Sequence, residues 1–467
     1  MFRKILIANR GEIALRILRA CRDLGIPAVV AYSEADRDSL AVRLADEAVC
    51  IGPAPASKSY TNIPAVISAA LVTGCDALHP GYGFLAENAY LADVCQQVGV
   101  TFIGPPADVI ARMGDKAEAR KLMRDAGVPL LPGTEGTIQN LGEARHAARK
   151  IGFPVMIKAV AGGGGRGMRI ARDDSELTRL LPLAQAEAES AFGNGAVYLE
   201  RFLERPRHIE VQVLADHHGH VYAIGERDCS LQRRHQKVLE EAPAPNLPRK
   251  VRENLLRAAV KGAKAAGYRN AGTLEFLVDA DGHFYFMEMN TRIQVEHPVT
   301  EETTRLDLVA WQIRIAAGEP FQIDQRELEP HGHAIECRIT AEDAANDFSP
   351  NVGTIDTFIM PSGPGIRFDT HLYAGYTVPP HYDSLLGKLI AWGQTRDEAI
   401  ARMERALSEL IITGIAHTGP FHRDLINDPA FRRGEVHTGF IADVLERRAA
   451  AHAAREHGHT SFGGGAR

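Results

Sequence analysis

Cysteine is scarce in this sequence, and no dense cysteine framework is present. The six cysteines are spread over 467 residues without a single Cys-x-x-Cys pair. This spacing argues against a secreted domain held together by disulfides. It suits reduced thiols in the cytoplasm, where we expect the protein to reside.

Long apolar runs and an excess of positive charge are also missing. The apolar run at residues 5–8 ends at Asn9, too early for a signal peptide, and no window reaches the about 18 apolar residues that span a membrane. Lys and Arg number 53 against 59 Asp and Glu, which gives a formal net charge of -6. We therefore expect neither a membrane nor a nucleic acid as a partner.

What the sequence does contain is an ordinary globular composition. Hydrophobic residues make up 45% and charged residues 24% of the chain, which excludes wholesale disorder. At about 150 residues per domain, the length suggests about three domains.

The N-terminal region alternates strand and helix patterns. Apolar runs at residues 4–8 and 27–32 predict buried strands, and helical periodicity predicts helices over 12–24 and 63–72. Strands that alternate with helices at this interval predict an α/β fold with a doubly wound parallel sheet, here over residues 1–114.

Glycine and proline residues between 127 and 133 separate this region from a smaller segment. We expect a small α+β lid at about 134–203, within a larger region that spans 115–330. A mixed-sheet C-terminal domain at 331–446 and a flexible tail at 447–467 complete the predicted organisation.

A glycine-rich loop lies between two strands predicted for the lid. Five of the six residues 162–167 are glycine, and Lys158 and Arg166 add positive charge. Glycines let backbone N–H groups approach phosphate oxygens closely, so we interpret the loop as a hinged lid over nucleotide phosphates. It is not a P-loop, because the Gly-Lys-Ser/Thr ending is missing. The alternative is a flexible hairpin without a ligand.

Two acidic side chains are expected to face each other on a hairpin. If residues 280–283 form a four-residue loop, Glu275 lies opposite Glu288, while Met287 and its apolar neighbours point to the other face. Directly opposed side chains lie about 4.5–5.5 Å apart, where like charges repel, so we expect a cation between them. With the oxygen of Asn290 they form an all-oxygen site suited to Mg²⁺ or Mn²⁺. The alternative is a solvated charged face.

Polar side chains continue on the same face after the hairpin. If the chain stays extended, Asn290, Arg292, Gln294 and Glu296 follow Glu288 on one ledge. Such a ledge could bind a metal, a small anion and a proton-transfer partner side by side. An exposed edge strand of mixed charge is the alternative.

A further strand pattern at 333–339 places Glu336 and Arg338 on one face. A poised arginine and a structural ion pair are both compatible with this pattern.

Together these segments resemble the biotin carboxylase family, the ATP-dependent component of biotin-dependent carboxylases, and above all the subunit of acetyl-CoA carboxylase. The resemblance extends from Lys4 to about Leu445 and implies an ATP-grasp fold. The motifs that carry it are Lys4–Ala14, His79–Asn88, Gly162–Met168, Glu226–Glu241, Glu288–Thr300 and Ala374–Pro380.

The resemblance also implies roles for individual residues. Those implied to contact ATP are Lys116, Lys158, Gly164, Gly165, Glu200, Arg201, Phe202, Leu203, His208, His235, Glu275 and Glu288. Those implied to bind the metal, Mg²⁺ or Mn²⁺, are Glu275, Glu288 and Asn290, and those implied to bind bicarbonate are Lys237, Arg292, Gln294 and the backbone of Val295. The implied catalytic residues are Lys237, Arg292, the general base Glu296, and Arg338, which would steady the ureido oxygen of biotin.

The implied activity is the carboxylation of biotin by ATP and bicarbonate through carboxyphosphate. Because no Ala/Val-Met-Lys-Met biotinylation motif occurs in the sequence, we expect biotin on a separate carrier protein, with carboxyltransferase subunits as further partners and a homodimer as the assembly. Acetyl-CoA is the default acceptor, and propionyl-CoA or pyruvate are alternatives. Arg201 departs from the usual lysine, and Val160 and Ala161 stand where many members have Ser and Gly.

Two rival functions are another ATP-grasp ligase and a non-catalytic nucleotide-binding regulator. A ligase of another kind should lack Arg338 and the ledge at 292–295. Intact Lys116, Glu275 and Glu296 argue against a regulator without activity.

Overall fold

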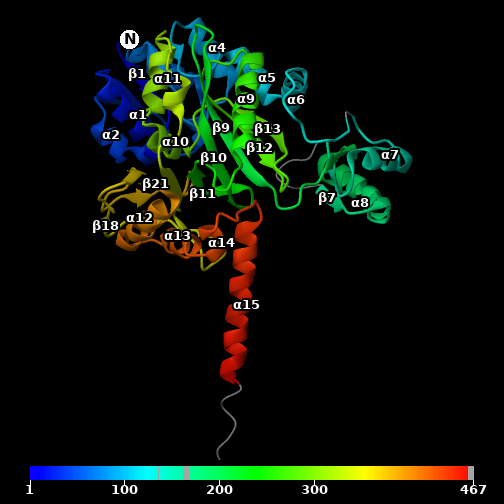
Figure 1. The fold of residues 1–467 in the computed structure, drawn as a ribbon. Helices are drawn as coiled ribbons and strands as arrows, with labels where there is room; N and C mark the ends of the chain where they lie inside the picture. Colours follow the sequence, from blue (N-terminus) through cyan, green and yellow to red (C-terminus); the bar gives the residue numbers. More distant parts are fainter. Residues whose placement is uncertain (135, 161–167, 461–467) are drawn as a thin grey trace, which may run out of the picture. The chain divides into compact units, whose positions relative to one another are not determined.

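The computed structural model describes residues 1–134, 136–160 and 168–460 (Figure 1). The glycine-rich loop at 161–167, with the predicted nucleotide contacts Gly164 and Gly165, lies outside these residues. The chain divides into two compact units. The first consists of Met1–Val128, Arg207–Phe276 and Glu288–Arg467, and the second of Pro129–Pro206 and Leu277–Met287.

The first unit begins with a five-stranded sheet, which confirms the predicted doubly wound parallel architecture. Its strands run parallel in the order β3-β2-β1-β4-β5. The strands are β1 (Ile5–Ile7), β2 (Ala28–Ser33), β3 (Glu47–Gly52), β4 (Ala77–His79) and β5 (Thr101–Phe102). The α-helices are α1 (Gly11–Asp23), α2 (Leu40–Leu44), α3 (Ile63–Val72), α4 (Ala89–Gln97), α5 (Ala107–Gly114) and α6 (Lys116–Asp125), with short 3₁₀ helices at Glu34–Asp36 and Ala56–Lys58.

Helices cover both faces of this sheet. On one face, Ile5 and Ile7 of β1 pack with Ile17 of α1. On the other face, Leu6 packs in a separate cluster with Val66 of α3 and with α4. Alternate strand residues therefore enter two different cores, as expected of a parallel sheet that is covered on both sides.

An eight-stranded sheet belongs largely to the first unit, and only the hairpin residues Leu277–Met287 of its strands β12 and β13 are assigned to the second (Figure 1). Its order is β13-β12-β9-β10-β11-β14-β21-β19. The strands are β9 (Arg207–Ala215), β10 (Val221–Arg233), β11 (Gln236–Ala242), β12 (Asn270–Val278), β13 (Phe284–Asn290), β14 (His333–Thr340), β19 (Ile366–Thr370) and β21 (Leu385–Gly393). The helices along this part of the chain are α9 (Arg249–Ala266), α10 (His297–Thr304) and α11 (Leu308–Ala316), with a 3₁₀ helix at Gln325–Leu328.

The antiparallel pairing of β11 with β14 joins two regions that are distant in sequence. β14 begins just after residue 330, the predicted end of the ATP-grasp region. One sheet therefore carries side chains from this region and from the C-terminal region. This pairing brings the predicted residues Lys237 and Arg338 into the same sheet.

The remaining elements of the first unit surround a C-terminal core that includes Leu389, Ile400 and Phe421. The short strands are β15 (Glu342–Asp343), β16 (Ser349–Pro350), β17 (Gly353–Thr354), β18 (Phe358–Ile359), β20 (Thr377–Val378) and β22 (Ile411–Ile412). The helices are α12 (Arg396–Glu409), α13 (Gly419–Ile426), α14 (Pro429–Arg432) and α15 (Phe440–Thr460). α15 runs through residues 447–460, where the sequence predicted a flexible tail.

The second unit is a small α+β body. Its antiparallel sheet has the order β7-β6-β8 and consists of β6 (Val155–Ala159), β7 (Met168–Ala171) and β8 (Val197–Arg201). Two helices, α7 (Leu141–Ile151) and α8 (Asp174–Phe192), pack on this sheet around Val155, Ile157 and Leu199. The side chain of Asp173 caps α8 by accepting a hydrogen bond from the backbone of Glu176.

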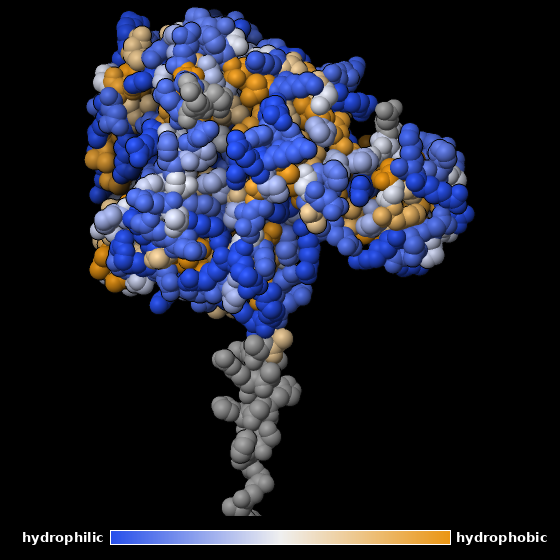
Figure 2. Space-filling view, viewed as in Figure 1, coloured by the Kyte–Doolittle hydropathy of each residue, from blue (hydrophilic) through white to orange (hydrophobic). Residues whose placement is uncertain are grey.

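No helix among the described residues is long and apolar enough to cross a membrane. On the face shown in Figure 2, hydrophilic side chains prevail and hydrophobic ones are scattered between them.

Candidate active site

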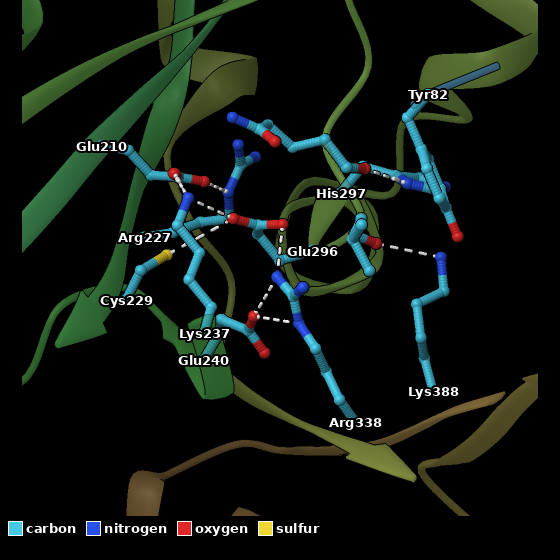
Figure 3. Close-up of polar contacts among 12 residues, drawn as sticks. Tyr82, Glu210, Arg227, Cys229, Lys237, Glu240, Glu296, His297, Arg338 and Lys388 are labelled. Atoms are coloured by element: carbon cyan, nitrogen blue, oxygen red, sulfur yellow. Dashed lines mark hydrogen bonds and ion pairs between the residues drawn. The ribbon is translucent and has the colours of Figure 1, made fainter. Parts of the chain in front are cut away.

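A buried lysine surrounded by three carboxylates forms the centre of the candidate site. Lys237 of β11 donates to Glu210 of β9 at 2.5 Å, to Glu275 of β12 at 2.9 Å and to Glu296 at 2.6 Å. Figure 3 shows Lys237 between Glu210 and Glu296. The lysine side chain is 13% exposed and the carboxylates 7% or less. Low solvent access strengthens each of these contacts, so the cluster fixes the ionisation of its members.

Lys237 determines the charge of two of its partners. Burial alone would raise the pKa of Glu275, but Lys237 and His208 outweigh burial and hold that pKa below its ordinary value. Burial likewise opposes ionisation of Glu296, yet Lys237, Arg338 and then Arg227 hold its pKa well below the ordinary value. Both side chains are therefore carboxylates at neutral pH, and Glu296 is able to accept a proton.

Arg338 lies between two acids at the edge of a cavity. Its guanidinium donates to Glu240 of β11 through Nε at 2.6 Å and to Glu296 through Nη2 at 2.9 Å (Figure 3). Its backbone oxygen lies 2.7 Å from the Nε2 atom of His422. The cavity has a volume of about 280 Å³. It is lined by Tyr82, Arg233, Gln236, Lys237, Val238, Val295, Arg338, Thr340, Glu342, Phe348, Asp383, Ser384, Leu385, Thr418 and His422.

The predicted metal ligands meet around Glu275. Its Oε1 atom accepts from the Asn290 amide at 2.9 Å, and its Oε2 atom lies 3.0 Å from His208 Nε2. Burial and then the charge of Glu275 raise the pKa of Glu288, while Lys116 opposes them. No hydrogen bond or ion pair engages the side chain of Glu288 within the described ranges. The Asn290 amide presents its nitrogen to Glu275, and its oxygen accepts from Arg292. With that oxygen turned toward the two repelling carboxylates, the three side chains would form a hard donor set that fits Mg²⁺ or Mn²⁺.

The loop of the hairpin differs from the prediction by one residue. The backbone N–H of Asp279 donates to the oxygen of His283 at 2.9 Å, so the loop has three residues, 280–282, and the four-residue prediction is wrong. Met287, predicted to point into the core, is instead 40% exposed. Glu288 beside it is also exposed, so the regular alternation is interrupted here.

Side chains of the predicted ledge contact one another, although the backbone that carries them is not an extended strand. β13 ends at Asn290, and Glu296 immediately precedes α10, so the extended conformation predicted for 291–296 is wrong. Arg292 nevertheless donates to Gln294 at 2.7 Å and to Asn290 at 3.2 Å. Gln294 in turn donates to Glu275 at 3.1 Å.

Several partners of the site were missed by the sequence analysis. Glu87 accepts from Arg292 at 2.9 Å, and the buried Lys388 donates to the backbone oxygen of Val295 at 2.9 Å. Glu210 is fully buried in β9 and also binds Arg227 at 2.5 Å. An acidic residue within an otherwise buried strand was the available signal for Glu210. Glu87 and Lys388 gave no such signal, because their partners are distant in sequence.

The other residues implied to contact ATP are distributed over both units. In the first unit, Lys116 begins α6, and His235 is an exposed turn residue with a positive φ of 65°. In the second unit, Lys158 and Glu200 form an ion pair of 2.5 Å. The remaining predicted contacts, Arg201, Phe202 and Leu203, directly follow Glu200 in the sequence, and Leu203 is buried.

Known protein families match most of the chain. Residues 1–110 match the family described as "Biotin carboxylase, N-terminal domain", and residues 336–443 match "Biotin carboxylase C-terminal domain". Residues 115–324 match "Carbamoyl-phosphate synthase L chain, ATP binding domain".

Individual relatives align over nearly their whole length. The biotin carboxylase of Nostoc sp. is 55% identical over 443 residues, which are 95% of this chain and 99% of the relative. Biotin carboxylase 1 of Bacillus subtilis is 54% identical over 442 residues, with 94% and 98% covered. A solved structure of the biotin carboxylase domain dimer of Hydrogenobacter thermophilus 2-oxoglutarate carboxylase, in complex with MgADP, ADP and bicarbonate, is 47% identical. It superposes with a TM-score of 0.85, covering 95% of this chain and 98% of that one.

Proposed function

The chain belongs to the biotin carboxylase family, and on this premise we propose that it carboxylates biotin with ATP and bicarbonate, giving carboxybiotin, ADP and phosphate. The observation that carries the proposal is the position of Lys237, 2.6 Å from Glu296 and 2.9 Å from Glu275. A cation thus lies between a carboxylate that can take a proton and a carboxylate that can bind a metal.

Bicarbonate activation is assigned to the residues around Lys237. Burial lowers the pKa of Lys237, but its three carboxylate partners raise it well above the ordinary value, so it is an ammonium that can bind an anion. Arg292, with Gln294 and the backbone of Val295, would hold the other side of the bicarbonate. An anion bound to Lys237 would compete with Glu296 for the positive charge of the lysine. The carboxylate of Glu296 would then be less stabilised, and its pKa would rise toward the range of an effective general base.

Phosphoryl transfer then follows from position and charge. The deprotonated bicarbonate oxygen attacks the γ-phosphorus of ATP, and ADP leaves as carboxyphosphate forms. Glu275, Glu288 and Asn290 would hold Mg²⁺ or Mn²⁺, which supplies charge stabilisation to the transferring phosphoryl group. The proposed remaining ATP contacts are Lys116, His208 and His235 in the first unit and Lys158, Gly164, Gly165 and Glu200 to Leu203 in the second.

Carboxylation of biotin is assigned to the cavity beside Arg338. Carboxyphosphate breaks down to CO₂ and phosphate, and the phosphate removes the proton from N1′ of biotin. Arg338 would stabilise the negative charge that develops on the ureido oxygen. The N1′ nitrogen then forms its new bond to CO₂.

We further propose the assembly in which the enzyme operates. Biotin would arrive on a separate carrier protein, and a carboxyltransferase would pass the carboxyl group to acetyl-CoA or another acyl acceptor. A homodimer is the proposed oligomer, and the proposed domains are 1–114, 115–330 with a lid at 134–203, and 331–446.

The decisive experiment is ATP hydrolysis by the purified chain with Mg²⁺. We expect hydrolysis that depends on bicarbonate and is stimulated by free biotin, with [¹⁴C]bicarbonate recovered in carboxybiotin. Hydrolysis that needs a different acceptor, such as an amine, would instead support another ATP-grasp ligase. Nucleotide binding without turnover would support a regulator.

A further inference from the structure

Two buried glutamates face each other behind Arg338. Glu240 of β11 and Glu336 of β14 are direct cross-strand partners in the register of the sheet. Both side chains are 0% exposed. Side chains in this relation lie about 4.5–5.5 Å apart at their Cβ atoms, so their carboxyl groups are within reach of each other.

The hydrogen bonding of this pair is incomplete. Glu240 accepts from Arg338 through Oε1, whereas its Oε2 atom has no hydrogen-bond partner among the described residues. Both oxygens of Glu336 likewise lack a partner in that part of the chain. Buried polar atoms are rarely left unpaired, and two adjacent buried carboxylates repel. One proton between the two groups would remove both problems.

The charges around the pair agree with one bound proton. Burial raises the pKa of Glu336 well above its ordinary value, Lys388 of β21 opposes this, and Glu240 adds to it. Burial raises the pKa of Glu240 to about 7, although Arg338 opposes this.

The other charged or titratable groups that interact with the pair come from β10, β11, β14 and the residue that precedes α10. Lys237 lowers the pKa of Glu240, and the carboxylate of Glu296 raises it. Cys229 and Cys337 also interact with the pair, and both are neutral thiols because burial raises their pKa well above the ordinary value.

We propose that Glu240 and Glu336 share one proton and act as positioning residues for Arg338: neutral Glu336 donates to the free oxygen of Glu240, and ionised Glu240 holds the guanidinium. This inference rests on the proposed function, because the contact of Arg338 with biotin gives the pair its purpose.

The shared proton limits the negative charge around Arg338. Glu240 and Glu296 already bind the guanidinium from two sides (Figure 3). An ionised Glu336 would add a third carboxylate to this environment and draw Arg338 away from the cavity that it lines. Neutral Glu336 leaves the two existing bonds in place and the rest of the guanidinium available to the ureido oxygen.

Infrared spectroscopy of the full chain tests the proton directly. We expect a C=O stretching band of a protonated carboxylic acid at pH 6.5 that disappears in Glu336→Gln. The matched control is Glu241→Gln on the same strand as Glu240. Glu241 is equally buried, but despite burial its bonds to His333 and Arg396 hold its pKa at about 2, so this variant should retain the band. A spectrum of Glu336→Gln identical to that of the wild type would overturn the proposal.

Kinetics test the positioning role. The amide of Glu336→Gln can still donate to Glu240, so we expect a KM for biotin close to that of the wild type. Glu336→Leu leaves the Oε2 atom of Glu240 without a donor, and we expect the KM for biotin of this variant to rise about tenfold or more, with a smaller change in the KM for ATP. An unchanged KM for biotin in a folded Glu336→Leu variant would overturn the positioning role.

The outcomes separate this inference from the proposed function. If Glu336→Leu does not fold, the infrared comparison with Glu336→Gln still decides whether the proton is present. If the wild type shows no biotin-stimulated ATP hydrolysis, the proposed function fails, while the infrared band still reports on the pair.

Discussion

Two groups of buried glutamates in the same sheet have opposite charge states. Glu275 and Glu296 contact Lys237, and their pKa values are held below the ordinary range. Glu336 contacts no donor in the described part of the chain, and its pKa is raised well above the ordinary value. Burial is nearly equal in the two groups, so it does not account for the difference. The balance between neighbouring cations and neighbouring carboxylates accounts for it, because Glu240 keeps a raised pKa even though Arg338 donates to it at 2.6 Å.

The comparison explains how one site can hold a base and an acid side by side. In the proposed mechanism the ionised group borders the substrates, where a proton would be accepted and a metal held. The neutral group lies behind Arg338, where extra negative charge would compete with biotin. Removing or moving a cation should therefore interconvert the two kinds of glutamate.

Substitution of Lys237 by methionine should have the largest effect, because it removes the cation that keeps Glu275 and Glu296 ionised. It leaves three buried carboxylates without their shared cation, and we expect the free energy of unfolding at pH 7 to fall by about 3–5 kcal/mol. Urea denaturation measures this loss. Because the freed carboxylates can protonate, the loss should shrink as the pH falls toward 5.

Lys237→Arg is the control for this substitution, because it keeps the charge. It should recover most of the stability but little of the bicarbonate-dependent ATP hydrolysis, since the planar guanidinium cannot reproduce three contacts to one point charge. A Lys237→Met protein as stable as the wild type at pH 7 would show that the carboxylates are not held ionised by this lysine.

Substitution of Glu296 by glutamine tests the ionised group alone. The amide cannot accept the proton of bicarbonate, so we expect kcat of biotin-dependent ATP hydrolysis to fall by about 10²–10⁴-fold. Nucleotide affinity should change little. Equal rates for the variant and the wild type would exclude Glu296 as the general base, and Glu302→Gln on the neighbouring helix serves as the matched control.

The sequence alone was sufficient to bring the acidic and amide side chains of one hairpin together, but not to predict the buried pair of Glu240 and Glu336. Glu275, Glu288 and Asn290 lie within one hairpin, so their proximity could be predicted, but the shorter loop and the interrupted alternation mean that the predicted direct opposition of Glu275 and Glu288 does not follow from the strand register. Their resemblance to a family pattern led to the same residues. Local periodicity carries information about residues of one hairpin, whereas Lys237, which is distant in sequence from Glu275 and Glu296, was reached only through the family resemblance.

The pairing of Glu240 with Glu336 could not be predicted in this way. It depends on the register between β11 and β14, two strands separated by about ninety residues. The same holds for Lys388, which reaches Val295 and Glu12 from β21. Contacts between distant segments are set by packing of the whole sheet, and a single sequence contains no periodic signal for them.

The pH dependence of the free energy of unfolding is a further test of the difference between the two groups of glutamates, with a smaller expected effect. A carboxyl whose pKa rises on folding takes up a proton as the chain folds, so stability falls as the pH rises from its ordinary pKa to its folded pKa. For Glu336, which carries the shared proton, this window begins at the ordinary value of 4.5 and extends well above it. We expect the wild type to lose stability relative to Glu336→Gln across this window, by up to about 1.4 kcal/mol per pH unit for one shared proton. Thermal unfolding at a series of pH values measures the slope, and parallel curves would contradict it.

Substitution of Glu288 by glutamine should have the smallest effect. It distinguishes two ways in which the repulsion between neighbouring carboxylates can be relieved, by a bound proton or by a bound metal ion. The pKa of Glu288 is raised by burial and by Glu275, much as that of Glu336 is raised by burial and by Glu240. Glu288 is partly exposed, however, and a divalent cation can reach it. We expect Glu288→Gln to weaken Mn²⁺ binding with a nonhydrolysable ATP analogue by about 10–100-fold, measured by electron paramagnetic resonance, since Glu275 and Asn290 remain. The exposed Asp281→Asn on the same hairpin should not change the affinity. Equal Mn²⁺ affinity in Glu288→Gln and the wild type would mean that Glu288, like Glu336, is relieved by a proton and not by a metal.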